Sequence, residues 1–63
     1  MRITQAVVDE CLDNCVENGG PMDLTADVTQ ICIDLGTYAQ PCEGAEVEQL
    51  LPLVNNWLER RIR

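Results

Sequence analysis

Apolar side chains recur at intervals of three and four along the first third of the chain, and acidic side chains fall between them. At about 100° per residue, one side of a helix collects the apolar set. This set consists of Ile3, Val7, Val8, Cys11, Leu12, Cys15 and Val16. Thr4 suits the N-cap, and NGGP at 18–21 is a strong stop, because glycine readily adopts the left-handed conformation. The pattern predicts an amphipathic helix over residues 4–18.

A second helix is predicted over residues 24–35, between a proline and a glycine that break the pattern. We expect Asp23 to cap it and Met22 to pack back as a hydrophobic staple. Its apolar stripe consists of Leu24, Val28, Ile31 and Leu35, with Cys32 at the edge. Ala26 and Ile33 face nearly the opposite way, and a helix that is apolar on two faces is often central in a bundle or part of an interface.

The stretch GTYAQPCEG at 36–44 is a loop by composition, because glycine and proline interrupt helices. A third helix is predicted over 45–61, with an inner face formed by Val47, Leu50, Leu51, Val54, Leu58 and Ile62 and widened by Leu53 and Trp57. Pro52 lies within it, where proline removes one hydrogen bond at a cost of about 3 kcal/mol. The helix either kinks there or restarts with Pro52 at its first position. The periodicity runs straight through, which favours a kinked, continuous helix.

These segments predict an all-α fold, a small three-helix bundle formed by a single domain over residues 1–63. Neither a useful length of β alternation nor an internal repeat is present. The apolar surface is larger than three short helices need, which predicts a symmetric homodimer through the second and third helices. Its interface is expected to contain Ile33, Leu53 and Trp57. Trp57 suits either the centre of that interface or the core of the monomer.

The net charge of −7 is distributed unevenly along the chain. Between Ile3 and Leu58 there are ten acidic residues and no basic one, and the four arginines lie at the two ends. Such an acidic field repels phosphates, so it disfavours direct contact with nucleic acid and favours a protein partner with a basic surface. The residues expected to meet that partner are Asp9, Glu10, Asp13, Glu17, Asp27 and Asp34. The arginines of the final LERRIR suit a helix C-terminus, where cations complement the helix dipole.

The chain contains no histidine, lysine, serine or phenylalanine. Catalysis at neutral pH usually needs a base with a pKa near 7 or an activated nucleophile, and no imidazole is present to help. We therefore expect a protein that is not an enzyme and that holds no cofactor. The start MRITQAVVDE lacks the apolar segment of a secretion signal, and no window reaches the length of a membrane span. These features predict a cytoplasmic protein without membrane contact.

Four cysteines are the remaining candidates for chemistry, and they occur as Cys11-x3-Cys15 and Cys32-x9-Cys42. Four thiolates could complete a zinc shell, but structural zinc sites use short spacings in both ligand pairs. A single disulfide from Cys42 to the first helix, or oxidation during purification, is a second possibility. The favoured interpretation places Cys11, Cys15 and Cys32 in the core as reduced thiols and Cys42 in the loop, since free cysteine behaves as a small hydrophobe.

The Cys32-x9-Cys42 spacing resembles that of the helical-hairpin proteins of the mitochondrial intermembrane space. In that family two helices carry equal spacings, so that two disulfides form between them. Here the first pair departs from the pattern, because four residues rise about 6 Å along a helix and ten rise about 15 Å. The two pairs would not align, and the resemblance is rejected.

Three functions are compatible with these features. The first is a non-catalytic adaptor or regulator that acts by protein–protein interaction, through the acidic face and exposed apolar side chains. The second is an inhibitor of a nucleic-acid-handling protein, of the kind carried by phages and mobile elements, whose carboxylates mimic phosphates. The third is a zinc or redox module based on Cys11, Cys15, Cys32 and Cys42.

Overall fold

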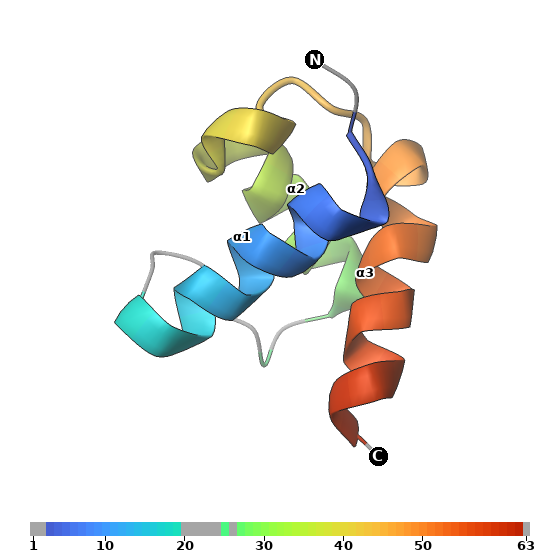
Figure 1. Cartoon of the computed structure of the whole chain (residues 1–63). Coiled ribbons are helices and arrows are strands. Elements are labelled where there is room, and N and C mark those ends of the chain that lie inside the picture. Colours follow the sequence, from blue (N-terminus) through green and yellow to red (C-terminus); the bar gives the residue numbers. More distant parts are fainter. Residues whose placement is uncertain (1–2, 20–24, 26, 63) are drawn as a thin grey trace.

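The computed structural model describes residues 3–19, 25 and 27–62, apart from the side chain at position 62. Three α-helices and one short 3-10 helix follow one another along the chain (Figure 1). They are α1 (Gln5–Asn18), α2 (Val28–Tyr38), η1 (Gln40–Cys42) and α3 (Val47–Ile62). No strand occurs among the described residues, and the fold is the all-α three-helix bundle that the sequence predicts.

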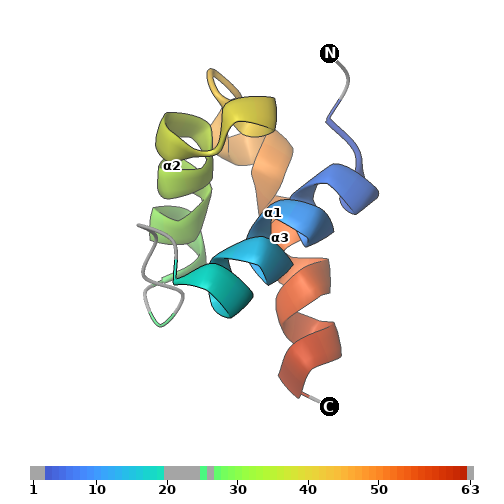
Figure 2. The same ribbon diagram turned by 60° about the vertical axis from the view of Figure 1, so that its left-hand side comes forward.

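The longest helix, α3, holds the bundle together because it packs against both α1 and α2. α1 runs across α3 and not along it, as the two views of the ribbon show (Figures 1 and 2). The short helix η1 contacts both α2 and α1. The central position considered for the second helix therefore belongs to the third, and α2 occupies one side of the bundle.

α1 begins and ends as the sequence predicts. The hydroxyl of Thr4 accepts a hydrogen bond from the Val7 backbone N–H at 3.4 Å, which satisfies one of the free donors of the first turn. Gly19 adopts the left-handed conformation with φ of 66°, and its N–H donates to the carbonyl of Cys15. The cap and the stop glycine together fix the length of the helix.

α2 starts later and ends later than predicted. Thr25 and Asp27 are not helical, and Asp27 precedes the helix without a capping hydrogen bond from its side chain. The expected cap Asp23 and staple Met22 lie outside the described residues. The helix continues through Gly36 to Tyr38.

Gly36 does not end α2. Its lack of a side chain instead allows the backbone of Ala45 to approach the helix closely. A Cβ atom at this position would lie 2.8 Å from the backbone oxygen of Ala45. The Gly36 carbonyl also accepts the N–H of Gly44 at 3.0 Å. The missing side chain thus lets the segment before α3 fold back onto α2.

The segment after α2 corrects the prediction of an open loop around Cys42. Gln40, Pro41 and Cys42 form a single 3-10 turn, in which the Cys42 N–H donates to the Ala39 carbonyl at 2.9 Å. The Cys42 carbonyl in turn accepts the N–H of Ala45 at 3.0 Å. This turn directs the Cys42 side chain inward, where it is 0% exposed. Cys42 is therefore a core residue.

α3 runs without interruption through Pro52, in agreement with the continuous helix that the periodicity favours. Pro52 lies on the exposed side. Glu48 occupies the first turn, and Arg60 and Arg61 occupy the last turn, an arrangement that complements the helix dipole at both ends.

The core gathers apolar side chains from all four helical elements. Its members are Val8, Leu12, Ile31, Cys32, Leu35, Cys42, Leu50, Val54 and Trp57. No buried polar or charged residue occurs among the residues that the structure describes. Within the same residues, no helix combines the length and the apolar character that crossing a bilayer requires.

Candidate functional site

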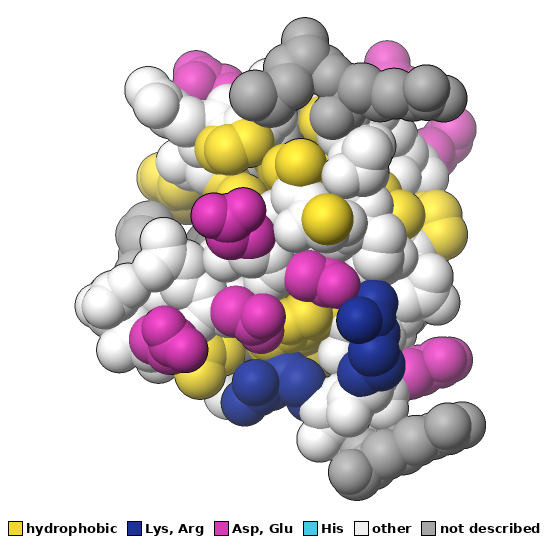
Figure 3. All heavy atoms as spheres, in the orientation of Figure 1, with side chains coloured by type: hydrophobic (Ala, Val, Ile, Leu, Met, Phe, Trp, Pro, Cys, Tyr) yellow, Lys and Arg dark blue, Asp and Glu magenta, His cyan; other side chains and the backbone are white. Residues whose placement is uncertain are grey.

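Three of the acids predicted on the first helix form an exposed row on α1. Glu10, Asp13 and Glu17 are solvent-exposed and lie within about 60° of one another around the helix axis, and we call them the acidic row. Figure 3 shows acidic side chains gathered over α1, with arginine side chains beside them over the C-terminal part of α3. The fourth acid, Asp9, is half-buried and has a different role.

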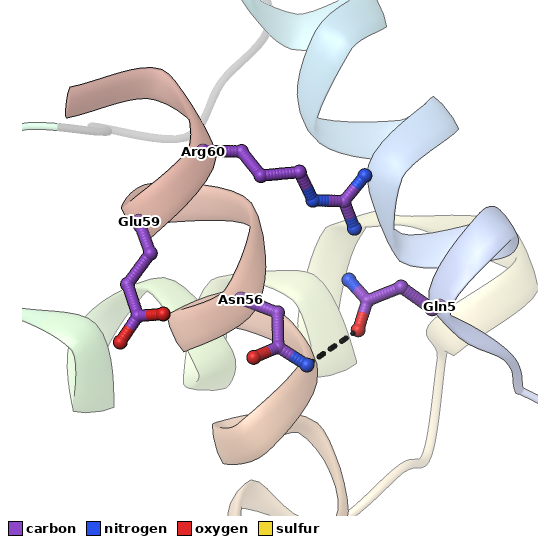
Figure 4. A pocket seen from close by; sticks show the side chains of 4 residues that line it. All are labelled: Gln5, Asn56, Glu59 and Arg60. Carbon is purple, nitrogen blue, oxygen red and sulfur yellow. Dashed lines mark hydrogen bonds between the residues drawn. The ribbon is translucent and has the colours of Figure 1, made fainter. Parts of the chain in front are cut away.

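Asp9 belongs to a polar seam, formed by the side chains of Gln5, Asp9, Asn56 and Arg60, that joins the start of α1 to α3. One of its carboxylate oxygens lies 3.1 Å from a guanidinium nitrogen of Arg60. The other accepts a hydrogen bond from the Gln5 amide at 2.8 Å, and that same amide nitrogen donates to the Leu53 carbonyl at 2.8 Å. Asn56 donates to the Gln5 carbonyl oxygen at 3.1 Å (Figure 4). Both N–H groups and the oxygen of the Gln5 amide are thus engaged.

A surface hollow lies over this seam and is lined by Gln5, Asn56, Glu59 and Arg60 (Figure 4). Three of its lining side chains, those of Gln5, Asn56 and Arg60, belong to the network that joins α1 to α3. No buried side-chain nitrogen or oxygen among the described residues lacks a hydrogen-bond partner. The hollow therefore presents no unpaired buried group to a ligand. The contacts around it hold α1 in place against α3.

Trp57 joins the acidic row to the core. Of the two places considered for it, the structure shows the monomer core, where it is 4% exposed. Its indole N–H donates to the Asp13 carboxylate at 2.9 Å, and the Arg61 guanidinium carbon lies 4.9 Å from the ring centroid. The side chains of two terminal arginines thus have partners within the molecule, since Arg60 pairs with Asp9 and Arg61 stacks on the Trp57 indole.

The other residues predicted at a dimer interface differ in exposure. Ile33 is 44% exposed, whereas Leu53 is half-buried and packs against the core cluster. The large apolar side chains that are exposed among the described residues are Val16, Ile33 and Tyr38. The homodimer stays a prediction, and sedimentation equilibrium at micromolar concentration would test it.

Of the two remaining acids predicted to meet a partner, one lies just before α2 and the other within it. Asp27 is exposed just before the helix starts. Asp34 is half-buried and accepts a hydrogen bond from Gln30 at 3.1 Å. They extend from a different helix than the acidic row.

The four cysteines all lie among the described residues and none is in a disulfide, but the structure brings two of them close together. Cys11 of α1 and Cys42 of η1 lie close enough together for each thiol to affect the pKa of the other. Burial raises the pKa of Cys42 to about 11, with the neighbouring Cys11 as a further cause. Burial also raises the pKa of Cys32. It raises the pKa of Cys11 as well, an effect that the neighbouring Cys42 thiol opposes and the charge of Glu10 reinforces. A raised pKa makes these thiols weak nucleophiles at neutral pH.

The described residues contain no group of three or more cysteine, aspartate or glutamate side chains that could hold a metal ion. What the arrangement offers chemically is an exposed acidic row on α1 and one pair of neighbouring thiols. No protein-family model, curated protein or solved structure matches the chain.

Proposed function

We propose that this chain is a non-catalytic interaction protein that presents the acidic row of α1 to a basic surface of a protein partner. The observation that supports this function is that Glu10, Asp13 and Glu17 are exposed together along one face of α1. A basic surface would meet three carboxylates, which steer association and set specificity more than they add raw affinity.

The helix that carries the acidic row is held against α3 by contacts within the chain, without a partner. The seam between Gln5, Asp9 and Arg60 fastens one part of α1 to α3. The hydrogen bond from Trp57 fixes one oxygen of Asp13 and orients its carboxylate. Less side-chain freedom is then lost on binding, which is the general advantage of a preorganised surface.

An apolar side chain beside the acidic row adds to the proposed contact. Val16 lies on α1 between Asp13 and Glu17 in sequence and is 44% exposed. Burial of apolar area of this kind supplies affinity that salt does not screen, whereas the carboxylates give a salt-dependent share. Binding should therefore weaken between low and moderate ionic strength without vanishing.

The test compares two variants of equal charge as bait in a pull-down from the native host. In the first, Glu10→Gln, Asp13→Asn and Glu17→Gln remove the acidic row. In the second, Glu43→Gln, Glu46→Gln and Glu48→Gln remove three exposed carboxylates from the segment before α3 and from its first turn. We expect the first variant to retain about tenfold less of a specific partner at moderate salt, measured by quantitative mass spectrometry, and the second to match the wild type. Equal retention by both variants would contradict the proposal.

The same pull-down distinguishes a nucleic-acid mimic from an ordinary interaction protein. If the acidic row occupies a groove meant for phosphates, added duplex DNA or RNA should displace the retained partner, and steeply so at low salt. If the partner's basic surface has another purpose, the nucleic acid should leave retention unchanged. Both results keep the acidic row as the contact, and they separate the regulator from the inhibitor.

A further inference from the structure

Cys11 and Cys42 come from separate elements and meet at the edge of the core. Cys11 lies in the middle of α1, and Cys42 is the last residue of η1. α1 and η1 pack directly against each other, and Cys11 packs against the core cluster to which Cys42 belongs, close enough for each thiol to affect the pKa of the other. Neighbouring thiols from two packed elements can form a disulfide with little movement of the backbone.

The two thiols differ in their access to solvent. Cys42 is 0% exposed and belongs to the core cluster. Cys11 is half-buried and packs against the edge of that cluster. A small molecule dissolved in water would therefore reach the sulfur of Cys11 first. Cys42 would be reached from within the protein, by the neighbouring sulfur of Cys11.

We propose that Cys11 and Cys42 are a reversible redox pair, which a small disulfide such as oxidised glutathione closes into an intramolecular disulfide between α1 and η1. The Cys11 thiolate attacks one sulfur of the small disulfide, so that the small S–S bond breaks and one small thiolate leaves. The Cys42 thiolate then attacks the Cys11 sulfur of the mixed disulfide and releases the second small thiolate. The protein gives up two protons and two electrons, and the oxidant becomes two small thiols.

The bond would covalently connect α1 and η1, which are now held together by packing. Because a disulfide restricts the unfolded chain, we expect closure to raise the midpoint of thermal unfolding by about 10 °C. Reduction by excess dithiol should return the midpoint to its starting value. The pair would thus make the stability of the chain depend on the redox state of its surroundings.

The sequence offers a direct way to identify the bonded pair. Cleavage before each aspartate separates all four cysteines, since Cys11 falls in residues 9–12, Cys15 in 13–22, Cys32 in 27–33 and Cys42 in 34–63. The native protein is incubated with oxidised glutathione, its remaining thiols are alkylated, and it is cleaved and analysed by mass spectrometry. We expect fragments 9–12 and 34–63 to be linked, with the other two cysteines alkylated.

Two variants test the order of the steps. In Cys42→Ala, the reaction should stop at the mixed disulfide, with one glutathione on fragment 9–12. Cys32→Ala removes another buried thiol and serves as the matched control, which should still close the bond between Cys11 and Cys42. A different linkage in the wild type, a disulfide between two chains, or four alkylated thiols after prolonged incubation would overturn the proposal. The wild-type result does not depend on whether either variant folds.

Discussion

Asp13 has a place both in the acidic row and in the packing of the core. Its carboxylate is exposed, yet one oxygen accepts the indole N–H of the buried Trp57. An indole N–H that is removed from water needs an acceptor, because leaving it unpaired costs about 1–3 kcal/mol. Asp13 thus satisfies the only polar group of the tryptophan while the rest of the carboxylate faces solvent.

This double role predicts that Asp13→Ala destabilises the fold by about 1 kcal/mol. The loss of a charge-assisted hydrogen bond outweighs the small gain that alanine brings to a helix. Urea unfolding followed by the fluorescence of Trp57 measures the effect. Glu17→Ala is the matched control, since Glu17 is exposed on the same face of α1, and its free energy of unfolding should stay within about 0.5 kcal/mol of the wild type. Equal effects of the two substitutions would contradict the role given to Asp13.

The helical period predicts which acids point away from the apolar side, but it does not predict their partners. Trp57 and Asp13 are 44 positions apart in the chain. The pairing of Asp9 with Arg60 likewise joins α1 to α3. Such contacts depend on how α1 crosses α3, and a pattern read along one helix contains no information on that crossing.

At the scale of elements, the same amphipathic pattern predicts three helices and their inner faces. It also favours a continuous helix through Pro52, as the structure shows. The same pattern predicts that Gly36 ends the second helix, because glycine often follows a helix. Its actual role depends on Ala45, whose carbonyl oxygen approaches α2 only in the folded chain. Composition alone does not distinguish a glycine that ends a helix from one that admits a neighbouring backbone.

The close approach at Gly36 reverses the usual effect of adding a methyl group to a helix. Gly36→Ala would gain up to about 1 kcal/mol from helix propensity alone. Its Cβ would, however, lie 2.8 Å from the Ala45 oxygen, which belongs to the backbone and cannot rotate away. We expect a net loss of about 1–3 kcal/mol in the free energy of unfolding, measured by urea denaturation.

The neighbouring position provides the control for this substitution. Thr37 is exposed on α2, and its hydroxyl donates to the Ile33 carbonyl within the same helix at 2.8 Å. Thr37→Ala should be neutral or slightly stabilising, because alanine favours the helix and the lost bond is local. A stabilising Gly36→Ala would show that the segment before α3 yields at little cost.

At the scale of the whole molecule, burial of Cys42 was the feature that the sequence least revealed. A single 3-10 turn has no period to detect, and glycine and proline around it indicate a loop. The turn becomes meaningful only once α1, α2 and α3 enclose a space that the Cys42 side chain fills. The thiol contact with Cys11 follows from that enclosure.

Burial of the Cys42 thiol makes the free energy of unfolding depend on pH in the alkaline range. Its pKa is raised by burial from an ordinary value of 9.0 to about 11. Below pH 9 the thiol is protonated in both states, so its full contribution to stability is present. Between pH 9 and 11 the unfolded chain loses this proton while the folded chain keeps it. The free energy of unfolding should therefore fall by about 2 kcal/mol across that window, with Cys11 and Cys32 acting in the same direction.

Urea unfolding from pH 8 to 11, with a phosphine reductant present, measures this dependence in the wild type and in Cys42→Ala. The variant should be less stable near neutral pH, because a core atom is lost, and it should lose less stability as the pH rises. Val54→Ala is the matched control, since it truncates another fully buried side chain and removes no titrating group. It should keep the wild-type slope. If Cys42→Ala and Val54→Ala lost stability with pH at the same rate, the thiol of Cys42 would have to be reachable by water in the folded chain, and the order of attack proposed for the redox pair would fall with it.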